Sequence, residues 1–556
     1  MTRSTKQRTG GRILADQLRV HGVERAFCVP GESYLALLDA LYDTAEISLV
    51  VCRHEGGAAM MADAYGKLTG RPGVCLVTRA PGATNASAGV HIAYQDSTPM
   101  VLLIGQVARG VVDRESFQEI DFRRMFGQMA KWVAQIDTAS RIPEYLSHAF
   151  YTACAGRAGP VVLALPEDML AEQAAVDDAE SYRIVQPHAG SGEIERLREL
   201  LSTCARPLMI LGGSGWTPAA CEDIKVFAEA NNIAVAVSFR CQHLFDNTHP
   251  NYIGDVGIGV NPRLAQRVRD ADLLLVVGAR LGEMTTSGYT LIDVPRPRQT
   301  LVHVYPDAGE LGRVYQPALA INAGMPGFAA AARTLACTES AAWEPLTAEA
   351  RSDYVAYIRP TETPGELQLA EVVVWLRENL PADAIVANGA GNYTAWVHRF
   401  YQYRGFRSQL APTSGSMGYG TPAAIAAKAQ HPDRTVVCFA GDGCFLMTGQ
   451  ELATAVQYGL NIVVLVVNNG MYGTIRMHQE RNYPGRVCGT TLRNPDFVAL
   501  ARAYGAYGEL VERTGEFPAA FERAISAGTP ALLELRVDPE AITPRASLSE
   551  IRGGVR

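Results

Sequence analysis

Residues 436–472 read VVCFAGDGCFLMTGQELATAVQYGLNIVVLVVNNGMY, and this stretch decides the fold that we expect for the whole chain. The apolar run at 436–440 is short enough for a buried strand and ends at the Gly-Asp-Gly turn 441–443. A helical pattern follows, and a second apolar run, 462–467, ends at Asn-Asn-Gly, 468–470. A strand, a helix and a second strand in this order are typical of an open parallel sheet.

Two side chains with oxygen atoms, Asp442 and Asn469, follow the two predicted strands. The carboxyl ends of parallel strands form the edge at which ligands bind. Mg²⁺ prefers oxygen ligands, and it often bridges protein side chains and phosphate. Gly441 and Gly443 let the backbone approach a phosphate, which the following helix N-terminus favours. An ordinary turn with Asp442 as a helix cap is the alternative, but the Asn pair one helix and one strand later favours a metal–phosphate site.

The composition is that of an ordinary globular protein of about three domains. The chain has 556 residues, of which 48% are hydrophobic and 19% charged, with a net charge of −7 and no long basic block. This charge argues against nucleic acid as a partner. The 11 cysteines are scattered without a CxxC pair, which predicts neither zinc nor a disulfide framework and fits a cytoplasmic protein. The N-terminus lacks the apolar core of a secretory signal, and the apolar runs are too short to span a membrane.

Strands alternate with helical patterns along the whole chain, which predicts an α/β protein with three doubly wound parallel-sheet domains. We place an N-terminal domain at 10–175, a central Rossmann-like domain at 190–338 and a C-terminal domain at 365–540. Polar stretches without periodicity, 176–192 and 338–364, are predicted as linkers.

Glu55 is the most unusual residue of the N-terminal domain, because it joins an apolar strand, SLVVCRHE, to a helix of small residues. A carboxylate buried at such a boundary is costly without a partner, and burial raises its pKa. A helix cap or an exposed strand end is the other reading of Glu55 from this stretch alone.

The segment from GDG to NN resembles the motif of the thiamine-diphosphate-dependent enzymes. RHEGGAAMMADAYG, VPGESYLALLDAL, APGATN and GQVARGVVDRESFQEIDF resemble the acetolactate synthase-like branch of that family, although Ala80 replaces a Gly of the branch. The resemblance covers nearly the whole chain. It implies a pyrimidine-binding domain, a central domain and a diphosphate-binding domain, in this order. It also implies that the side chains of Asp442 and Asn469 and the Met471 carbonyl hold Mg²⁺, which anchors the diphosphate.

The same resemblance implies roles for further residues. Glu55 would bond a pyrimidine nitrogen of the cofactor and favour its imino tautomer. Gln118 would face the thiazolium ring, and Met417 would separate the two rings. His478 stands where the synthases carry a Trp that selects the acceptor; it is either a proton donor or acceptor near neutral pH, or a solvated helix residue. The other implied cofactor-binding residues are Pro30, Gly31, Asn85, Gly391, Asn392, Tyr393, Gly415, Gly441, Gly443, Cys444, Met471 and Tyr472.

An enzyme of this branch would decarboxylate a 2-oxo acid such as pyruvate and transfer the carbanion-enamine to a second carbonyl compound. The alternative within the family is a simple non-oxidative decarboxylase that releases an aldehyde. A nicotinamide dehydrogenase built on the central GGSG loop, 212–215, and a non-catalytic binding protein are more remote alternatives.

The resemblance also bears on further ligands and on assembly. In different members of the family the central domain binds FAD, ADP or nothing. Glu55 and Asp442 lie in different predicted domains, and in the family the two positions come from different subunits. The chain is therefore expected to form a homodimer or homotetramer with active sites at the subunit interface.

Overall fold

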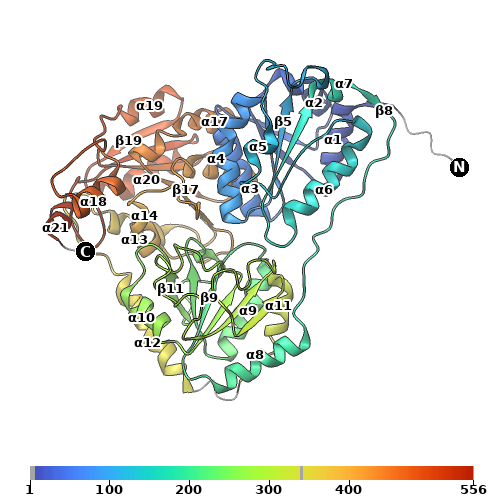
Figure 1. Cartoon of the computed structure of the whole chain (residues 1–556). Coiled ribbons are helices and arrows are strands. Elements are labelled where there is room, and N and C mark those ends of the chain that lie inside the picture. The colour runs from blue at the N-terminus through green and yellow to red at the C-terminus, as the bar shows by residue number, and fades with distance from the viewer. Residues whose placement is uncertain (1–6, 338–341, 555–556) are drawn as a thin grey trace. The chain divides into compact units, whose positions relative to one another are not determined.

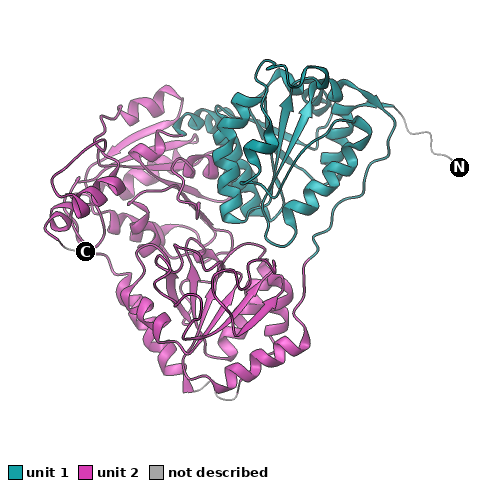
Figure 2. Cartoon of the chain, in the orientation of Figure 1, with its two compact units in different colours: residues 1–185, 425–430, 448–458 teal, residues 186–424, 431–447, 459–556 magenta. Residues whose placement is uncertain are grey.

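The computed structural model describes residues 7–337 and 342–554, and Figure 1 shows the order of its elements. The chain divides into two compact units, shown in Figure 2. Unit 1 comprises residues up to 185 with two later segments, 425–430 and 448–458. Unit 2 comprises 186–424, 431–447 and the residues from 459 onward. The expected end of the central domain, residue 338, lies outside the described residues.

Unit 1 is built on a sheet of six parallel strands in the order β3-β2-β4-β5-β7-β6. The strands are β2 (Arg25–Cys28), β3 (Ser48–Val51), β4 (Gly73–Val77), β5 (Met100–Gln106), β6 (Trp132–Gln135) and β7 (Pro160–Pro166). The helices are α1 (Gly10–Val20), α2 (Leu35–Tyr42), α3 (Glu55–Thr69), α4 (Ala80–Asp96), α5 (Phe122–Phe126), α6 (Ile142–Cys154) and α7 (Glu167–Ala171). Helices α1, α2 and α6 pack their apolar sides on one face of the sheet. A short antiparallel pair, β1 (Arg8–Thr9) and β8 (Gln173–Ala174), lies outside this sheet.

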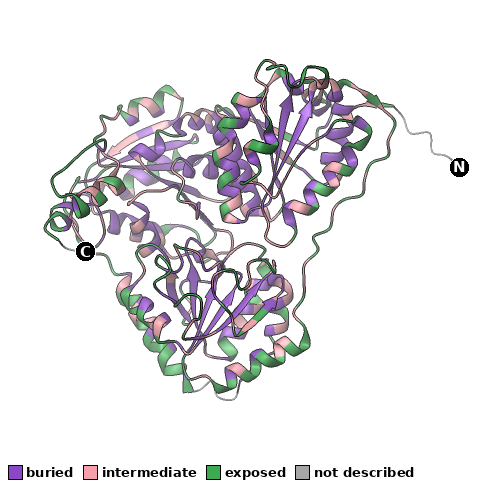
Figure 3. Cartoon of the chain, viewed as in Figure 1, coloured by how far each residue is buried: buried purple, intermediate pink, exposed green. Residues whose placement is uncertain are grey.

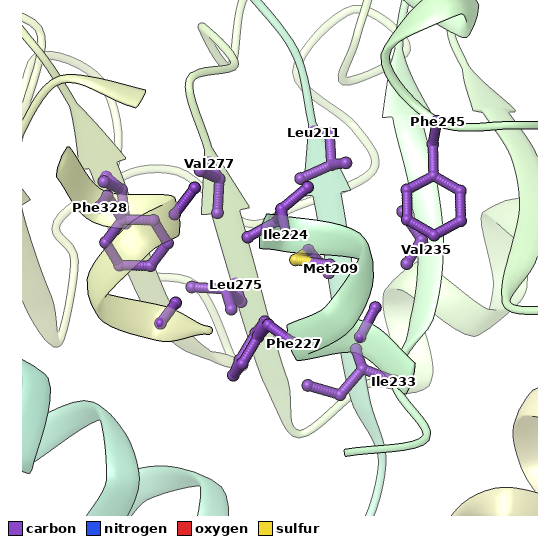
Figure 4. Close-up of a cluster of buried hydrophobic side chains, with 14 of the residues drawn as sticks. Met209, Leu211, Ile224, Phe227, Ile233, Val235, Phe245, Leu275, Val277 and Phe328 are labelled. Atoms are coloured by element: carbon purple, nitrogen blue, oxygen red, sulfur yellow. The ribbon is translucent and has the colours of Figure 1, made fainter. Parts of the chain in front are cut away.

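The central sheet of unit 2 has the order β11-β10-β9-β12-β13-β14, again all parallel. Numbered by sequence this order is 3-2-1-4-5-6, the order of dinucleotide-binding folds. The strands are β9 (Pro207–Leu211), β10 (Ala234–Ser238), β11 (Tyr252–Val256), β12 (Leu273–Val277), β13 (Thr300–Tyr305) and β14 (Leu319–Asn322). The helices are α8 (Ser191–Thr203), α9 (Pro218–Ala230), α10 (Pro262–Asp270), α11 (Met325–Ala332) and α12 (Glu344–Tyr357). Figure 4 shows how Ile224 and Phe227 of α9 pack over Met209 and Leu275 of the sheet.

The second sheet of unit 2 has the order β16-β15-β17-β18-β20-β19. Its strands are β15 (Ile385–Asn388), β16 (Gln409–Leu410), β17 (Val436–Gly441), β18 (Val463–Asn468), β19 (Tyr507–Val511) and β20 (Ala531–Arg536). The accompanying helices are α13 (Leu369–Asn379), α14 (Thr394–Phe400), α15 (Gly420–Gln430), α16 (Asp442–Phe445), α17 (Leu452–Gln457), α18 (Gly473–Asn482), α19 (Phe497–Ala503), α20 (Phe517–Ser526) and α21 (Leu548–Arg552). Helix α17 and the last six residues of α15 belong to unit 1.

The sheet of unit 1 and this second sheet have the same topology, because both read 2-1-3-4-6-5 when their strands are numbered by sequence. In such a sheet the order in which strands are added reverses between the first and third strands, and ligands bind in the crevice outside the carboxyl ends of these two strands. The loops after β2 and β4, and those after β15 and β17, are therefore the expected ligand-binding loops. The fold is the α/β architecture of three parallel sheets that the sequence predicts.

The stretch 338–364, which the sequence predicts to be a linker, contains α12. This helix buries Thr347, Ala350 and Tyr354, which recur at helical spacing on one side. The polar residues between them conceal that narrow apolar stripe, so the prediction was wrong for this segment. The predicted linker 176–192 forms no helix or strand before Ser191, where α8 begins.

Burial follows the layers of the fold. The strands are buried along most of their length, whereas exposed residues gather on the outer sides of the helices (Figure 3). Within the described residues, none of the helices is long and apolar enough to cross a membrane.

Candidate active site

Glu55 is the first residue of α3 and is half-buried. Asn85 of α4 donates a hydrogen bond from Nδ2 to Glu55 Oε2 at 2.9 Å. The N-cap of α3 is His54, whose ring Nδ1 accepts a hydrogen bond from the backbone N–H of Gly56. Two of the residues predicted from the sequence, Glu55 and Asn85, are thus brought together within unit 1.

The loops after β2 and β4, where the strand order of the unit 1 sheet reverses, lie close together. Pro30 and Gly31 follow β2, and a Cβ atom added to Gly31 would lie 2.4 Å from the Thr78 Cβ just after β4. Gln118 lies close to the same place, because its carbonyl accepts a hydrogen bond from the Ala80 N–H at 3.1 Å. Its backbone has a φ of 64°, which is a strained conformation for a residue with a side chain. The segment that carries Gln118 is therefore fixed beside the start of α4.

Asp442 is the centre of the corresponding region in unit 2. Its strand, β17, pairs in parallel with β18, so Asp442 and the Asn468–Asn469 pair follow neighbouring strand ends. Asp442 Oδ2 accepts hydrogen bonds from the Gly470 N–H at 2.9 Å and from Asn494 Nδ2 at 2.8 Å. The Gly443 N–H bonds to Oδ1 at 2.9 Å.

Burial raises the pKa of Asp442 above its ordinary value, although the hydrogen bonds that it accepts oppose the shift. Every group that stabilises its charge is a neutral N–H donor. In addition, the buried Oδ1 of Asn494 has no hydrogen-bond partner in the described part of the chain. A buried carboxylate beside an unsatisfied amide oxygen is an oxygen-rich site that a hard divalent cation would complete.

The two residues of the Asn pair have different environments. Asn468 accepts from Asn494 and donates to Glu534 at 2.8 Å, so its side chain is held inside the fold. Asn469 is partly exposed and accepts a local bond from the Met471 N–H at 3.2 Å. Met471 pairs as an isolated bridge with Thr491. The residues that the sequence predicts as metal ligands therefore lie at one sheet edge.

Gly443 is required by a close approach of an aromatic side chain. A Cβ atom at this position would lie 2.6 Å from the ring of Tyr472. That distance is far below any normal contact, so a larger residue at this position of α16 would have to displace the Tyr472 ring. Tyr472 is held in turn by its N–H, which donates to the Thr490 carbonyl at 2.9 Å.

The loop after β15 lies against the same turn. Tyr393 is buried, its hydroxyl accepts from the Gly389 N–H at 3.1 Å, and it contacts Cys444 Sγ at 3.4 Å. Asn392 donates to the Ile542 carbonyl and accepts from Thr474. These side chains are engaged within the protein, so it is the backbone of Gly391 and its neighbours that is offered to a ligand.

The remaining predicted residues of unit 2 lie on neighbouring segments. Gly415 is exposed with a φ of 69°, and Met417 is half-buried against the core of the second sheet. His478 is exposed on α18. That helix is fixed by Glu480, which is buried and bonds both Arg476 and, from α21, Arg552. These arginines lower the pKa of Glu480 to about 2, with Arg552 as the main cause.

Two polar residues of this region were missed by the sequence reasoning. Asn494 lies 52 residues after Asp442 in sequence, and no local pattern connects them. Glu451 is completely buried and contacts the residues before Glu55. A carboxylate beside the apolar residues of a predicted helix was the one signal for it.

Within the described residues, no three His, Cys, Asp or Glu side chains cluster as a metal site. The candidate metal site is of another kind, with one carboxylate, amide oxygens and a backbone carbonyl. Two sheets of the same topology, each with glycine-rich loops where its strand order reverses, are typical of α/β proteins that bind a cofactor at this edge.

Comparison with known proteins identifies that class. Models of the thiamine pyrophosphate enzymes match the chain three times: the N-terminal TPP binding domain at 8–125, the central domain at 194–331 and the C-terminal TPP binding domain at 389–535. The chain belongs to the thiamine pyrophosphate enzyme family.

Several of its relatives are acetolactate synthases. The acetolactate synthase large subunit of Corynebacterium glutamicum is 32% identical over 93% of this chain and 84% of its own length. The isozyme 2 large subunit of Escherichia coli is 29% identical over 98% of this chain and 99% of its own. A probable acetolactate synthase large subunit of Methanocaldococcus jannaschii is 30% identical over 96% and 93%.

Proposed function

We propose that this thiamine pyrophosphate enzyme is a carboligase of acetolactate synthase type. It would remove CO₂ from a 2-oxo acid such as pyruvate and join the remaining unit to a second carbonyl compound. The observation that carries the proposal is that the chain aligns nearly end to end with acetolactate synthase large subunits while keeping Glu55 and Asp442 in structured half-sites. The products formed from pyruvate test it.

In this proposal, residues of unit 1 act on the reacting rings of the cofactor, and residues of unit 2 hold its diphosphate. When bound, thiamine pyrophosphate supplies an acidic carbon that adds to the 2-oxo group and takes up the electron pair released with CO₂. Glu55 would hold a proton at a pyrimidine nitrogen, with Asn85 fixing one of its oxygens. Gln118 would contact the thiazolium side, and Met417 would separate the two rings.

We propose that Asp442, Asn469 and the Met471 carbonyl hold Mg²⁺, which neutralises the diphosphate. The raised pKa of Asp442 supports this, because a bound cation would offset the cost of its buried charge. The backbone around Gly391, Gly415, Gly441 and Cys444 would approach the phosphate oxygens. His478, which is exposed on α18, would contact the substrate rather than the diphosphate end of the cofactor.

We propose that the central domain does not take FAD. The loops after β9 and β12 approach each other closely at the point where the strand order of that sheet reverses, and a Cβ at Gly213 would lie 2.0 Å from the Gly278 carbonyl oxygen. Trp216 is buried beside this contact and donates to the Gly212 carbonyl. Arg280, which follows β12, lies 3.5 Å from Glu310. The proposed reaction therefore uses no FAD.

We expect the purified protein to lack the visible absorbance of an oxidised flavin. Adding FAD to the protein and removing the excess by gel filtration should leave the protein colourless, because the loops after β9 and β12 lie close together where the cofactor would bind. A stoichiometric flavin spectrum retained after gel filtration would contradict this expectation. The same contact between loops gives no support for a nicotinamide dehydrogenase.

We propose that the chain forms a homodimer or homotetramer whose active sites combine Glu55 of one subunit with Asp442 of another. The two residues belong to different units, and both are needed at opposite ends of one cofactor. Sedimentation velocity at the concentration of the activity assay should give a dimer or a larger species. A fully active monomer under those conditions would exclude the shared site.

A simple decarboxylase is the second candidate, and one observation favours it. The position of the acceptor-selecting Trp holds His478, whose exposed imidazole can donate a proton. In that case the intermediate would be protonated rather than transferred, and acetaldehyde would be the product from pyruvate.

A further inference from the structure

Glu451 is a buried carboxylate that no proposed step uses. It ends a short 3₁₀ turn, Gly449–Glu451, immediately before α17, and it is 0% exposed. Burial raises its pKa above the ordinary value of a glutamate, opposed by the hydrogen bonds that it accepts. Burying a carboxylate costs free energy unless hydrogen-bond donors surround it.

The partners of Glu451 are the backbone amides that come directly before Glu55. Glu451 Oε1 accepts from the His54 N–H at 2.9 Å and from the Arg53 N–H at 3.1 Å. Oε2 lies 3.2 Å from the same Arg53 nitrogen and accepts from the Thr454 hydroxyl at 2.6 Å. Both carboxylate oxygens are thus saturated, and two of their donors belong to the connection between β3 and α3.

The carboxylate also limits the first turn of α3. A Cβ atom added to Gly57 would lie 2.5 Å from Glu451 Oε1 and 2.8 Å from its Cδ. Glu451 therefore lies against the helix N-terminus that Glu55 opens. A negative charge at this end of a helix is electrostatically favourable. The hydrogen bonds of Glu451 fix the backbone before Glu55, at residues 53–54, and its carboxylate leaves no room for a side chain at Gly57.

Further contacts align the same segment with β3. Gln457 Oε1 accepts from the Arg53 guanidinium at 2.5 Å, and the Tyr458 hydroxyl accepts from the Val51 N–H at 2.8 Å. These two contacts lie at the exposed end of the row, whereas Glu451 lies at its buried end. The Gln457 contact lies among exposed side chains, where water can replace it, whereas the Glu451 carboxylate is the buried acceptor of the two amides that precede Glu55.

Glu451 follows Asp442 by only nine residues. The chain passes from unit 2 to unit 1 between residues 447 and 448, and Figure 2 draws α17 in the colour of unit 1. One short segment therefore carries a proposed metal ligand at its start and the acceptor for the Glu55 loop at its end.

We infer that Glu451 is a positioning residue for Glu55: its carboxylate fixes the two amides that precede Glu55 and so sets the direction in which α3 presents that side chain. The inference rests on the role proposed for Glu55. It assigns to the GDG segment a second task, which is to orient the reacting carboxylate as well as to anchor the cofactor.

The test uses the full-length protein with two substitutions and a matched control. Glu451→Gln keeps the volume and one acceptor oxygen but removes the charge, and Glu451→Ala removes the acceptor altogether. The control, Gln457→Ala, removes a contact to Arg53 from the same segment and leaves the carboxylate intact. Amide hydrogen exchange of the cofactor-free proteins, turnover and thiamine pyrophosphate affinity are measured for each.

For Glu451→Ala we expect faster exchange confined to residues 51–57, and for Glu451→Gln a smaller effect at the same residues. Turnover of Glu451→Ala should fall roughly tenfold or more, as follows from the loss of hydrogen bonds to a charged acceptor. KM and cofactor affinity should remain unchanged, and Gln457→Ala should behave as wild type. Faster exchange across the whole of unit 1 would show a merely structural role and overturn the inference.

Failure of the inference can be told apart from failure of the proposed function by one comparison. If Glu451 variants keep wild-type exchange and turnover while Glu55→Gln is inactive, the positioning role alone is wrong. If Glu55→Gln is fully active, the proposed reaction site is wrong, and the exchange data still report whether Glu451 orders residues 51–57.

Discussion

Glu55→Gln is expected to lower turnover by about 100- to 10 000-fold, the range lost when a proton-transfer group is removed. The change keeps the size of the side chain, and Asn85 can still donate to the remaining carbonyl oxygen. The variant loses the ability to hold a proton at the pyrimidine nitrogen. Exchange of the cofactor's thiazolium C2 proton with deuterium, followed by NMR, should slow together with turnover.

The matched control is Glu46→Gln, which neutralises an exposed carboxylate of the same unit. It should leave turnover and C2 proton exchange at the wild-type level. Thermal unfolding should be alike in all three proteins. Wild-type C2 exchange in Glu55→Gln would show that another group does this work.

Asp442→Asn is expected to have the second large effect, on cofactor affinity. The carboxamide removes the negative charge and directs an N–H₂ group either toward the Gly443 donor or toward those of Gly470 and Asn494. Thiamine pyrophosphate affinity at a fixed Mg²⁺ concentration should fall by more than the roughly 10- to 100-fold lost when an outer partner of a metal ligand is removed. Calorimetric titration measures the change.

Wild-type protein treated with EDTA should show the same weak binding, and Mg²⁺ should restore it in the wild type but not in Asp442→Asn. Asp433→Asn, which changes an exposed carboxylate just before β17, is the control and should bind as wild type. Equal thiamine pyrophosphate affinity with and without Mg²⁺ in the wild type would show that no metal ion takes part in cofactor binding.

The parts of the fold that could be predicted are those encoded by continuous apolar runs. Strands of a parallel sheet are buried on both faces, so β17 and β18 stand out in the sequence as uninterrupted apolar segments. The glycine turn and the Asn pair at their ends then locate one half of the site. By contrast, α12 was missed because its apolar stripe is narrow and lies among polar residues.

The contacts inside the site could not be predicted from the residues alone. The Asn85–Glu55 bond depends on how α4 packs beside α3, which no local pattern states. The roles of Asn494 and Glu451 could not be predicted for the same reason. Each bonds a residue that is distant in sequence and is brought near by the packing of the fold. Family resemblance suggested the position of Asn85, and the geometry supplied its bond to Glu55.

The products formed from pyruvate show whether the protein makes a carbon–carbon bond after decarboxylation. Purified protein is incubated with pyruvate, thiamine pyrophosphate and Mg²⁺, and the products are identified by NMR. We expect release of CO₂ with formation of acetolactate, or of acetoin after its further loss of CO₂, and no product from Glu55→Gln. Acetaldehyde as the main product, or no consumption of any tested 2-oxo acid, would contradict this expectation.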